Sequence, residues 1–178
     1  MGAAVGTTSF ANAHMYVVFD KDISAITGAA TKAAQWAALK TKFPATAYIN
    51  KASKVTLPVQ TAKTFPVENM GAESDELVAG LPSLSEGMVE VGWVNDTTQI
   101  LDLRGKSIND DIAVALIQNT DDAATKGDPL RNSTQATAAI FGGTVAANAP
   151  IPAEPNTRAM IRVTIVSPIK AFLTDHAV

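Results

Sequence analysis

The sequence predicts a mainly β fold: an antiparallel two-sheet β-sandwich or barrel-like domain with one short flanking helix and a long inter-strand loop. Several short segments alternate apolar with polar or small residues at a period of two, and turn-forming residues separate these segments. Only two segments break the period in favour of a helix. The chain has 178 residues, so we expect one domain over 1–178 that buries about 70% of its unfolded surface.

Three segments carry the strongest strand signals: 88–94, 112–117 and 161–165. Bulky residues alternate with alanine in the second segment, and Arg162 and Thr164 separate apolar residues in the third. Successive side chains of a strand point to opposite faces, so each segment presents one apolar face to a core. The residues expected on these faces are Val89, Val91 and Trp93; Ile112, Val114 and Leu116; and Ile161, Val163 and Ile165.

Four more segments carry weaker strand signals. Val55, Leu57 and Val59 repeat the alternation, but Pro58 has no backbone N–H to donate, so this strand is expected at an edge of the sheet. The segment 138–147 contains two adjacent glycines, and we expect a strand that is bent or bulged there. The other two candidates are 14–19 and 45–49.

Two segments favour helices. Residues 95–105 have the start and stop residues of a short helix, with Ile100 and Leu103 placed to cover the sheet. Residues 28–42 are rich in alanine around Trp36, which favours a second helix. The alternative for 28–42 is an ordered insertion between strands.

A long stretch, 65–85, lacks a clear period and is predicted to be an irregular loop. Loops longer than about 12–15 residues are unusual in compact domains and are often functional. This one contains Val67, Met70 and Leu77, which suit docking onto a neighbouring chain better than exposure to water. The alternative is that 76–79 forms another strand of the same sheet.

The composition excludes several classes of function. The chain has 14 Lys and Arg against 17 Asp and Glu, a net charge of −3, which argues against a dedicated nucleic-acid binder. It has no cysteine and two histidines, His14 and His176, far apart in sequence. Disulfides, thiol nucleophiles and thiolate metal sites are therefore excluded, and no serine elbow or phosphate-binding loop is present. We expect no enzyme, no catalytic or metal-binding residue and no cofactor.

Two carboxylate pairs, Asp110-Asp111 and Asp121-Asp122, are the most conspicuous polar features. Adjacent residues of a strand point to opposite faces, so neither pair converges on one reacting atom. Such pairs more often mark turns and strand ends, although they also repel a polyanion. Only 17% of residues are charged, fewer than in most globular proteins. This low share is typical of surfaces that contact another protein chain. The alternative is that it only reflects an alanine-rich sequence.

The chain begins with no basic and apolar signal segment, and no stretch reaches the roughly 20 apolar residues that span a bilayer. We expect a soluble protein that is made in a reducing compartment and does not bind membranes.

The order of these features resembles the major tail tube protein of long-tailed (siphovirus-type) bacteriophages. The resemblance lies in Gly6-Thr7-Thr8 before the first strand, and in the strand–helix–strand unit 90–118 with its Val91-Gly92-Trp93-Val94. It continues in the closing strands 139–145 and 158–169, joined through Pro150-Ile151-Pro152. The likeness covers most of the chain as a pattern, and the alanine-rich segment 28–42 departs from it.

The resemblance implies a structural subunit that forms hexameric rings by joining sheets edge to edge. The rings would stack into a tube through which DNA passes without specific binding during ejection. The other partners implied are the tail tip, tape-measure and terminator proteins, and the location is the virion, after assembly in the host cytoplasm. Segment 65–85 would match the ring-stacking loop, and 1–14 and 170–178 the terminal arms.

Two sets of residues follow from this resemblance as site candidates. The first set would contact the next ring, and the second would face the lumen, whose walls should be acidic or neutral so that DNA is released. The inter-ring candidates are Val67, Met70, Glu73, Asp75, Glu76 and Leu77, and the lumen candidates are Asp110, Asp111, Asp121 and Asp122.

Two other functions stay open on the sequence. A carbohydrate-binding or adhesin sandwich is one, although few tyrosine and tryptophan residues are present to form a sugar platform. The other is the tube protein of a contractile or secretion system, which shares the implied fold.

Overall fold

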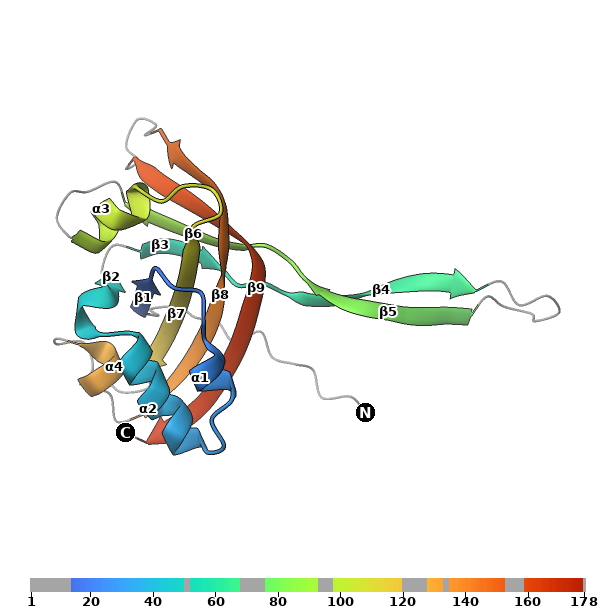
Figure 1. The fold of residues 1–178 in the computed structure, drawn as a ribbon, viewed down its shortest axis with the longest axis horizontal. Helices are drawn as coiled ribbons and strands as arrows, with labels where there is room; N and C mark the ends of the chain where they lie inside the picture. The colour runs from blue at the N-terminus through green and yellow to red at the C-terminus, as the bar shows by residue number, and fades with distance from the viewer. Residues whose placement is uncertain are drawn as a thin grey trace.

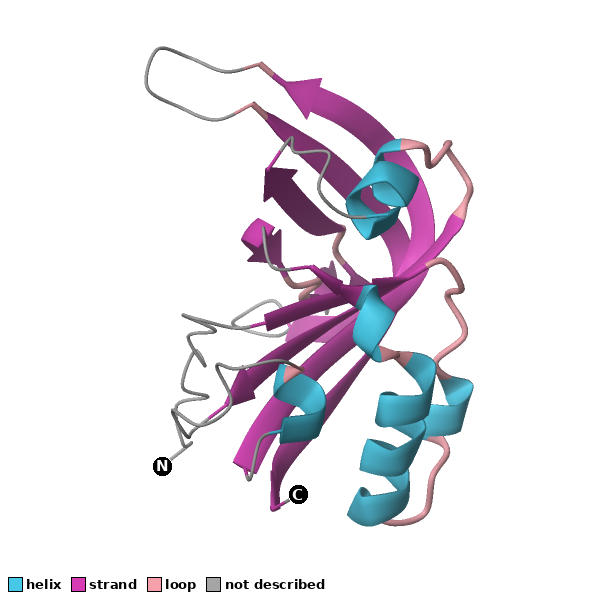
Figure 2. Cartoon of the chain, turned by 90° about the vertical axis from the view of Figure 1, so that its left-hand side faces the viewer, coloured by secondary structure: helices cyan, strands magenta, loops and turns pink. Residues whose placement is uncertain are grey.

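A computed structural model describes residues 14–49, 52–67, 76–92, 98–119, 128–132, 135–152 and 159–177. In this part of the chain, most strands join one antiparallel sheet, and four short α-helices and a 3₁₀ turn accompany it (Figures 1 and 2). The strands are β1 His14–Val18, β2 Tyr48–Ile49, β3 Ala52–Thr56, β4 Gln60–Val67, β5 Glu76–Leu84, β6 Gly87–Gly92, β7 Asp111–Asn119, β8 Gln135–Ile151 and β9 Met160–Ala177. The helices are α1 Ser24–Thr27, α2 Lys32–Lys42, α3 Thr98–Arg104 and α4 Pro129–Asn132, and the 3₁₀ turn η1 is Ala45–Ala47.

The main sheet has seven strands in the order β2-β1-β7-β8-β9-β6-β3, and every pairing is antiparallel. This confirms the predicted mainly β, antiparallel fold. The seven strands form one continuous sheet, and this sheet curls strongly, as Figure 1 shows along β8 and β9. These two strands, of 17 and 18 residues, run through both halves of the sheet and join them.

The curl is accompanied by irregular pairing between β8 and β9. The register shifts between Gly142 and Thr144, where Ser167 and Pro168 of β9 lie opposite a single residue of β8. This confirms the bulge predicted at the paired glycines, and it places the proline where a missing N–H is tolerated. A Cβ at Gly142 would also overlap the backbone carbonyl oxygen of Lys21, so only glycine fits there.

One face of the sheet, the inner face, carries the larger apolar cluster, and α3 closes it with Ile100 and Leu103. The predicted helix at 95–105 is thus confirmed over its described part. The faces predicted for 88–94, 112–117 and 161–165 are also confirmed, except that Trp93 lies outside the described residues. The buried strand residues of this cluster are Met15, Val17, Ile49, Val89, Val91, Ile112, Val114, Leu116, Ala139, Phe141, Val145, Ile161, Val163 and Ile165.

The other face, the outer face, is covered over part of its area by α1, α2 and α4 (Figure 2). The predicted helix within 28–42 is confirmed as α2, which starts where the Thr31 hydroxyl accepts a hydrogen bond from the Ala34 N–H at 3.2 Å. Its buried Trp36 and Leu39 belong to the same cluster as the small Ala113 and the other outer-face residues of β7 and β8. Small strand residues leave room for a helix to approach the sheet closely.

The edge strand β3 confirms the prediction made from Pro58. Val55 and Leu57 pack against the inner cluster, but Val59 is 56% exposed, so its predicted place on the core face is wrong. The physical reason is that β3 ends at Thr56 and the chain leaves the main sheet at the buried Pro58. Side-chain alternation does not continue through that break.

The stretch 65–85, predicted as an irregular loop, is for the most part strand. Its first residues end β4 and its last residues form β5, and these two strands make a separate two-stranded sheet. The alternative of an added strand at 76–79 is right about strand structure and wrong about the sheet, because β5 pairs with β4 alone. The segment 170–177, predicted as a terminal arm, is part of β9.

Candidate assembly interface

The β4–β5 pair, here called the ribbon, projects away from the main sheet (Figure 1). Its register runs from Gln60 opposite Leu84 to Val67 opposite Glu76, with one shift between Ala62 and Thr64. Among the described elements, none packs along it as the sheet strands pack along one another. A lone two-stranded hairpin is marginally stable in water, and both of its edges offer backbone groups for further pairing. The ribbon therefore has the character of a segment completed by another surface.

The base of the ribbon is fastened to the body of the protein. The Val59 N–H donates to Ser85 Oγ at 2.8 Å, and the Ser85 N–H donates to the Val59 carbonyl oxygen at 2.9 Å. On the body side of this pair, Leu57 packs against the inner cluster and Pro58 is buried. These contacts set the direction in which the ribbon leaves the sheet.

The main sheet also has unpaired edges within the described part of the chain. The pairing of β6 with β9 ends at Gly87 and Ile165, so residues 166–177 of β9 pair only with β8. At the end of the sheet, β3 pairs only with β6. Exposed strand edges are templates for pairing with another chain.

The predicted inter-ring residues divide between described and undescribed parts of the chain. Val67 ends β4 opposite Glu76, and Leu77 lies opposite Pro66, so these three residues share the far end of the described ribbon. Met70, Glu73 and Asp75 lie outside the described residues. Their role in contacts between rings remains a prediction.

Asp110 and Asp111, the first pair of predicted lumen residues, lie at a turn and at the start of a strand. This agrees with the alternative interpretation that such carboxylate pairs mark turns and strand ends. The Asp110 carboxylate accepts the Ser107 N–H at 2.8 Å, in a turn where Asn109 has a φ of 74°. Asp111 opens β7 and forms an ion pair with Lys21 at 2.9 Å, which offsets part of its negative charge. Asp121 and Asp122 lie outside the described residues. The structure brings Asp110 and Asp111 to one end of β7, and whether they face a lumen remains a prediction.

A polar network that sequence reasoning missed ties the short helices to the sheet. The buried Tyr16 hydroxyl donates to Asp128 Oδ1 at 2.6 Å and accepts the Leu130 N–H at 2.9 Å. Burial, and then Asp128, raise the pKa of Tyr16. Arg131 forms an ion pair with Asp128 and donates to the Phe43 carbonyl oxygen at 3.0 Å, just beyond the end of α2. The partners in this network are too distant in sequence for a local pattern to predict their contacts.

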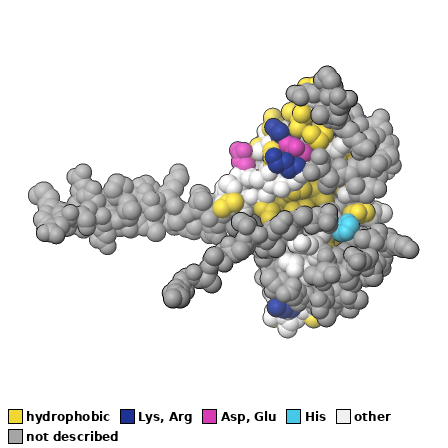
Figure 3. Space-filling model, turned by 180° about the vertical axis from the view of Figure 1, so that it is seen from behind, with side chains coloured by type: hydrophobic (Ala, Val, Ile, Leu, Met, Phe, Trp, Pro, Cys, Tyr) yellow, Lys and Arg dark blue, Asp and Glu magenta, His cyan; other side chains and the backbone are white. Residues whose placement is uncertain are grey.

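An ion pair lies on the part of the outer face that the helices leave uncovered. Glu90 of β6 lies between Lys54 of β3 and Arg162 of β9, and Arg162 Nε donates to Glu90 Oε1 at 2.8 Å. Charged side chains of both signs are seen together on this side of the molecule in Figure 3. Glu90 is only 5% exposed and is paired, as a buried carboxylate must be. The period of two placed it opposite to the core-facing Val89 and Val91.

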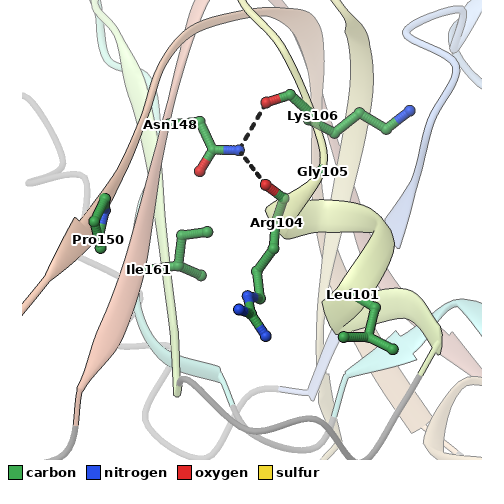
Figure 4. A pocket seen from close by; sticks show the side chains of 7 residues that line it. All are labelled: Leu101, Arg104, Gly105, Lys106, Asn148, Pro150 and Ile161. Carbon is green, nitrogen blue, oxygen red and sulfur yellow. Dashed lines mark hydrogen bonds between the residues drawn. The ribbon is translucent and has the colours of Figure 1, made fainter.

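A groove of about 550 Å³ lies between α3 and the ends of β8 and β9 (Figure 4). Leu101, Arg104 and Lys106 come from α3 and the turn after it, and Asn148 and Ile161 come from the two strands. Gly105 and Pro150 complete its lining. No local sequence pattern predicts this groove, because its two walls are far apart along the chain.

Asn148 holds the two walls of the groove together. Its Nδ2 donates to the carbonyl oxygens of Leu103, Arg104 and Lys106 at 3.1, 3.2 and 2.8 Å. The last carbonyls of a helix have no partner within the helix, so this amide satisfies groups that would otherwise need water. The contact fixes the end of α3 against β8.

The described residues contain no group of three or more His, Asp or Glu that could hold a metal ion. No helix in the described ranges is long and apolar enough to cross a membrane. The described residues do contain a projecting ribbon, open strand edges and a groove.

The solved structures that are similar to this chain include the following two. One is a chain of the cryo-EM structure of the anti-feeding prophage baseplate, six-fold symmetrised, with 10% identity, 71% of this chain and 83% of that chain covered, and a TM-score of 0.47. The other is a crystal structure of Hcp protein, with 11% identity, 90% and 96% of the two chains covered, and a TM-score of 0.39. No family model and no curated protein matches the sequence. We therefore infer the function from the geometry of the chain itself.

Proposed function

We propose that the chain is a structural subunit of a phage-type tail tube. Copies join side by side into hexameric rings, the rings stack, and DNA passes through the resulting conduit during ejection. The single observation that carries this proposal is the ribbon, which leaves the main sheet and packs along no other described element.

Stacking explains why the ribbon exists. Because a two-stranded ribbon gains little stability by itself, its ordering is compensated when it docks on a second molecule. Its sequence includes Leu77, Val78 and Leu81, whose burial on docking would contribute about 1.5–3 kcal/mol each. The inter-ring candidates Val67, Met70, Glu73, Asp75, Glu76 and Leu77 are proposed to make this contact.

Ring closure explains the open edges of the main sheet. The free edges of β3 and of β9 beyond Ile165 belong to different parts of the sheet, so one copy offers two distinct edges to its neighbours. A contact between two different surfaces is heterologous, and it closes into a ring when the rotation between copies divides a full turn. Once the ring closes, the edges of β3 and of β9 beyond Ile165 are no longer available for aggregation.

The walls of the conduit must release DNA. We propose that Asp110, Asp111, Asp121 and Asp122 face the lumen, where carboxylates repel phosphates and so prevent tight binding. Lys21 moderates this effect at Asp111 through its ion pair.

The proposal is tested by negative-stain microscopy of the purified chain at increasing concentration, with rings and tubes as the expected result. The matched variant replaces residues 61–83 with Asn-Gly, which closes a two-residue hairpin between Gln60 and Leu84, opposite residues in the ribbon. This variant keeps the Val59–Ser85 contacts and the inner cluster, so we expect it to fold and to form rings that do not stack.

Two outcomes would contradict the proposal. A wild-type chain that stays monomeric at every concentration, even with a nucleating tail complex, would remove the assembly function. A ribbon-free variant that loses its circular dichroism and its cooperative unfolding would show that the ribbon belongs to the folding core instead.

A further inference from the structure

We propose that the groove beside α3 receives the ribbon of a neighbouring copy, through the acidic segment at the ribbon's far end. This inference rests on the proposed stacking function and names the surface on which the ribbon docks.

The groove is cationic with apolar walls. Arg104 extends between Leu101 and Ile161 in Figure 4, and Lys106 follows two residues later. The Lys106 ammonium lies 4.2 Å from the centre of the Phe19 ring, which holds this cation close to the body of the protein. No carboxylate is among the residues that line the groove in the described part of the chain.

The carbonyl oxygens at the end of α3 beside the groove are hydrogen-bonded. The C-terminal carbonyl oxygens of a helix carry partial negative charge, which would repel an acidic ligand. Here the Asn148 amide donates to those of Leu103 and Arg104, and to the Lys106 carbonyl oxygen in the turn after α3. An acidic segment that enters the groove thus meets two cations beside carbonyls that are already hydrogen-bonded.

The groove also has exposed apolar surface. Leu101, which lines the groove, is 46% exposed. Ile108 is not part of the lining but follows Lys106 by two residues in the chain, and it is 65% exposed. These are two of the three large hydrophobic residues that stand exposed in the described part of the chain, and the third, Val59, lies at the base of the ribbon. Large exposed apolar residues beside cations favour a partner that is both apolar and acidic.

The ribbon sequence has this composition. Residues 67–77 include the acidic Glu68, Glu73, Asp75 and Glu76 and the apolar Val67, Met70 and Leu77, and they contain no Lys or Arg. The charge of this segment is therefore opposite to that of the groove.

The ribbon of the same chain does not reach the groove. Figure 1 shows the ribbon leaving on the side of the molecule opposite to α3. The occupant is consequently a second copy, and repetition of this contact along an axis produces a stack without a set limit.

The test is a charge swap in the full chain. R104E combined with K106E should raise the critical concentration for tube formation by about tenfold or more, since a lost interaction of 1.4 kcal/mol is a tenfold change. Adding E73K and D75K to the same chain should restore assembly, because the two charges then have opposite signs again. The matched control is K32E with K40E on α2, which makes the same change of charge away from the groove and should leave the critical concentration unchanged.

A second measurement uses the absence of cysteine from the chain. Two separately purified variants, M70C and L101C, are mixed under mild oxidation, and the disulfide-linked peptides are identified by mass spectrometry. We expect a link between positions 70 and 101 in the mixture, and none between M70C and a T27C control on α1.

The outcomes separate this inference from the proposed function. If the wild type forms tubes and the R104E/K106E variant forms them equally well, the ribbon docks elsewhere and the inference is overturned while the tube function stands. If the variant loses binding to double-stranded DNA with assembly unchanged, the groove binds phosphates and the inference is again overturned. If the wild type forms no rings or tubes, the proposed function itself fails.

Discussion

Replacing Asn148 with alanine tests whether one amide holds α3 to the sheet. The substitution removes three hydrogen bonds, from Nδ2 to the carbonyl oxygens of Leu103, Arg104 and Lys106. An ordinary hydrogen bond contributes about 0.5–1.5 kcal/mol net to stability, and half-exposed carbonyls recover part of this from water. We therefore expect N148A to lower the free energy of unfolding by about 2 kcal/mol, which for a chain of this size is a Tm lower by about 4–8 °C.

The isosteric N148D variant sharpens the test. It keeps the shape of the side chain but has no N–H to donate, and it places a negative charge beside the negative end of α3. We expect N148D to be at least as destabilised as N148A at neutral pH. The control is A149S at the exposed neighbouring position, which should stay within about 0.5 kcal/mol of the wild type.

Urea unfolding followed by circular dichroism measures these differences as a shift of the midpoint at constant slope. Midpoints of N148A and N148D equal to that of the wild type would refute the reasoning, since α3 would then be held by its apolar contacts alone.

Two further predictions concern the sheet. G142A should lower the free energy of unfolding by about 1–3 kcal/mol, because the new Cβ overlaps the Lys21 carbonyl oxygen where β8 and β9 pair irregularly. The control G105A, at the exposed end of α3, should be nearly neutral. Thermal unfolding of both variants measures this difference, and equal losses of stability would contradict the prediction. Burial lowers the pKa of His14 below its usual value near 6.5, so the unfolded chain takes up this proton first. The contribution of His14 to stability is thus full above pH 6.5 and is lost as the pH falls toward the lowered pKa. Chemical unfolding at pH 7.5 and pH 5.5 should show a smaller pH dependence in H14Q than in the wild type, and identical dependence would contradict the assignment.

The local pattern of the sequence was sufficient for the strands at 88–94, 112–117 and 161–165 and for the faces that their described residues bury, but not for β5 or for the end of β9. Alternation in 112–117 identifies Ile112, Val114 and Leu116 as inner-face residues, because strand geometry forces a period of two wherever one face is apolar. The paired glycines of β8 identify the place where its pairing with β9 is irregular, since a local backbone irregularity leaves a local composition signal. The alanine-rich run around Trp36 identifies α2 for the same reason.

The candidate interface depended on information that no local pattern holds. Alternation states which side chains share a face, but it does not state which strand pairs with which, so β4 and β5 could not be recognised as a ribbon apart from the main sheet. The groove joins α3 to β8 through Asn148, and the network at Tyr16 joins β1 to α4, over many intervening residues. Composition and periodicity determined the mainly β fold and its buried faces, because those follow from neighbours along the chain. Only the tertiary structure decided where the open edges, the ribbon and the groove lie. Each of them arises from contacts between segments far apart in the sequence, and the sequence of one segment does not show which other segment it will contact.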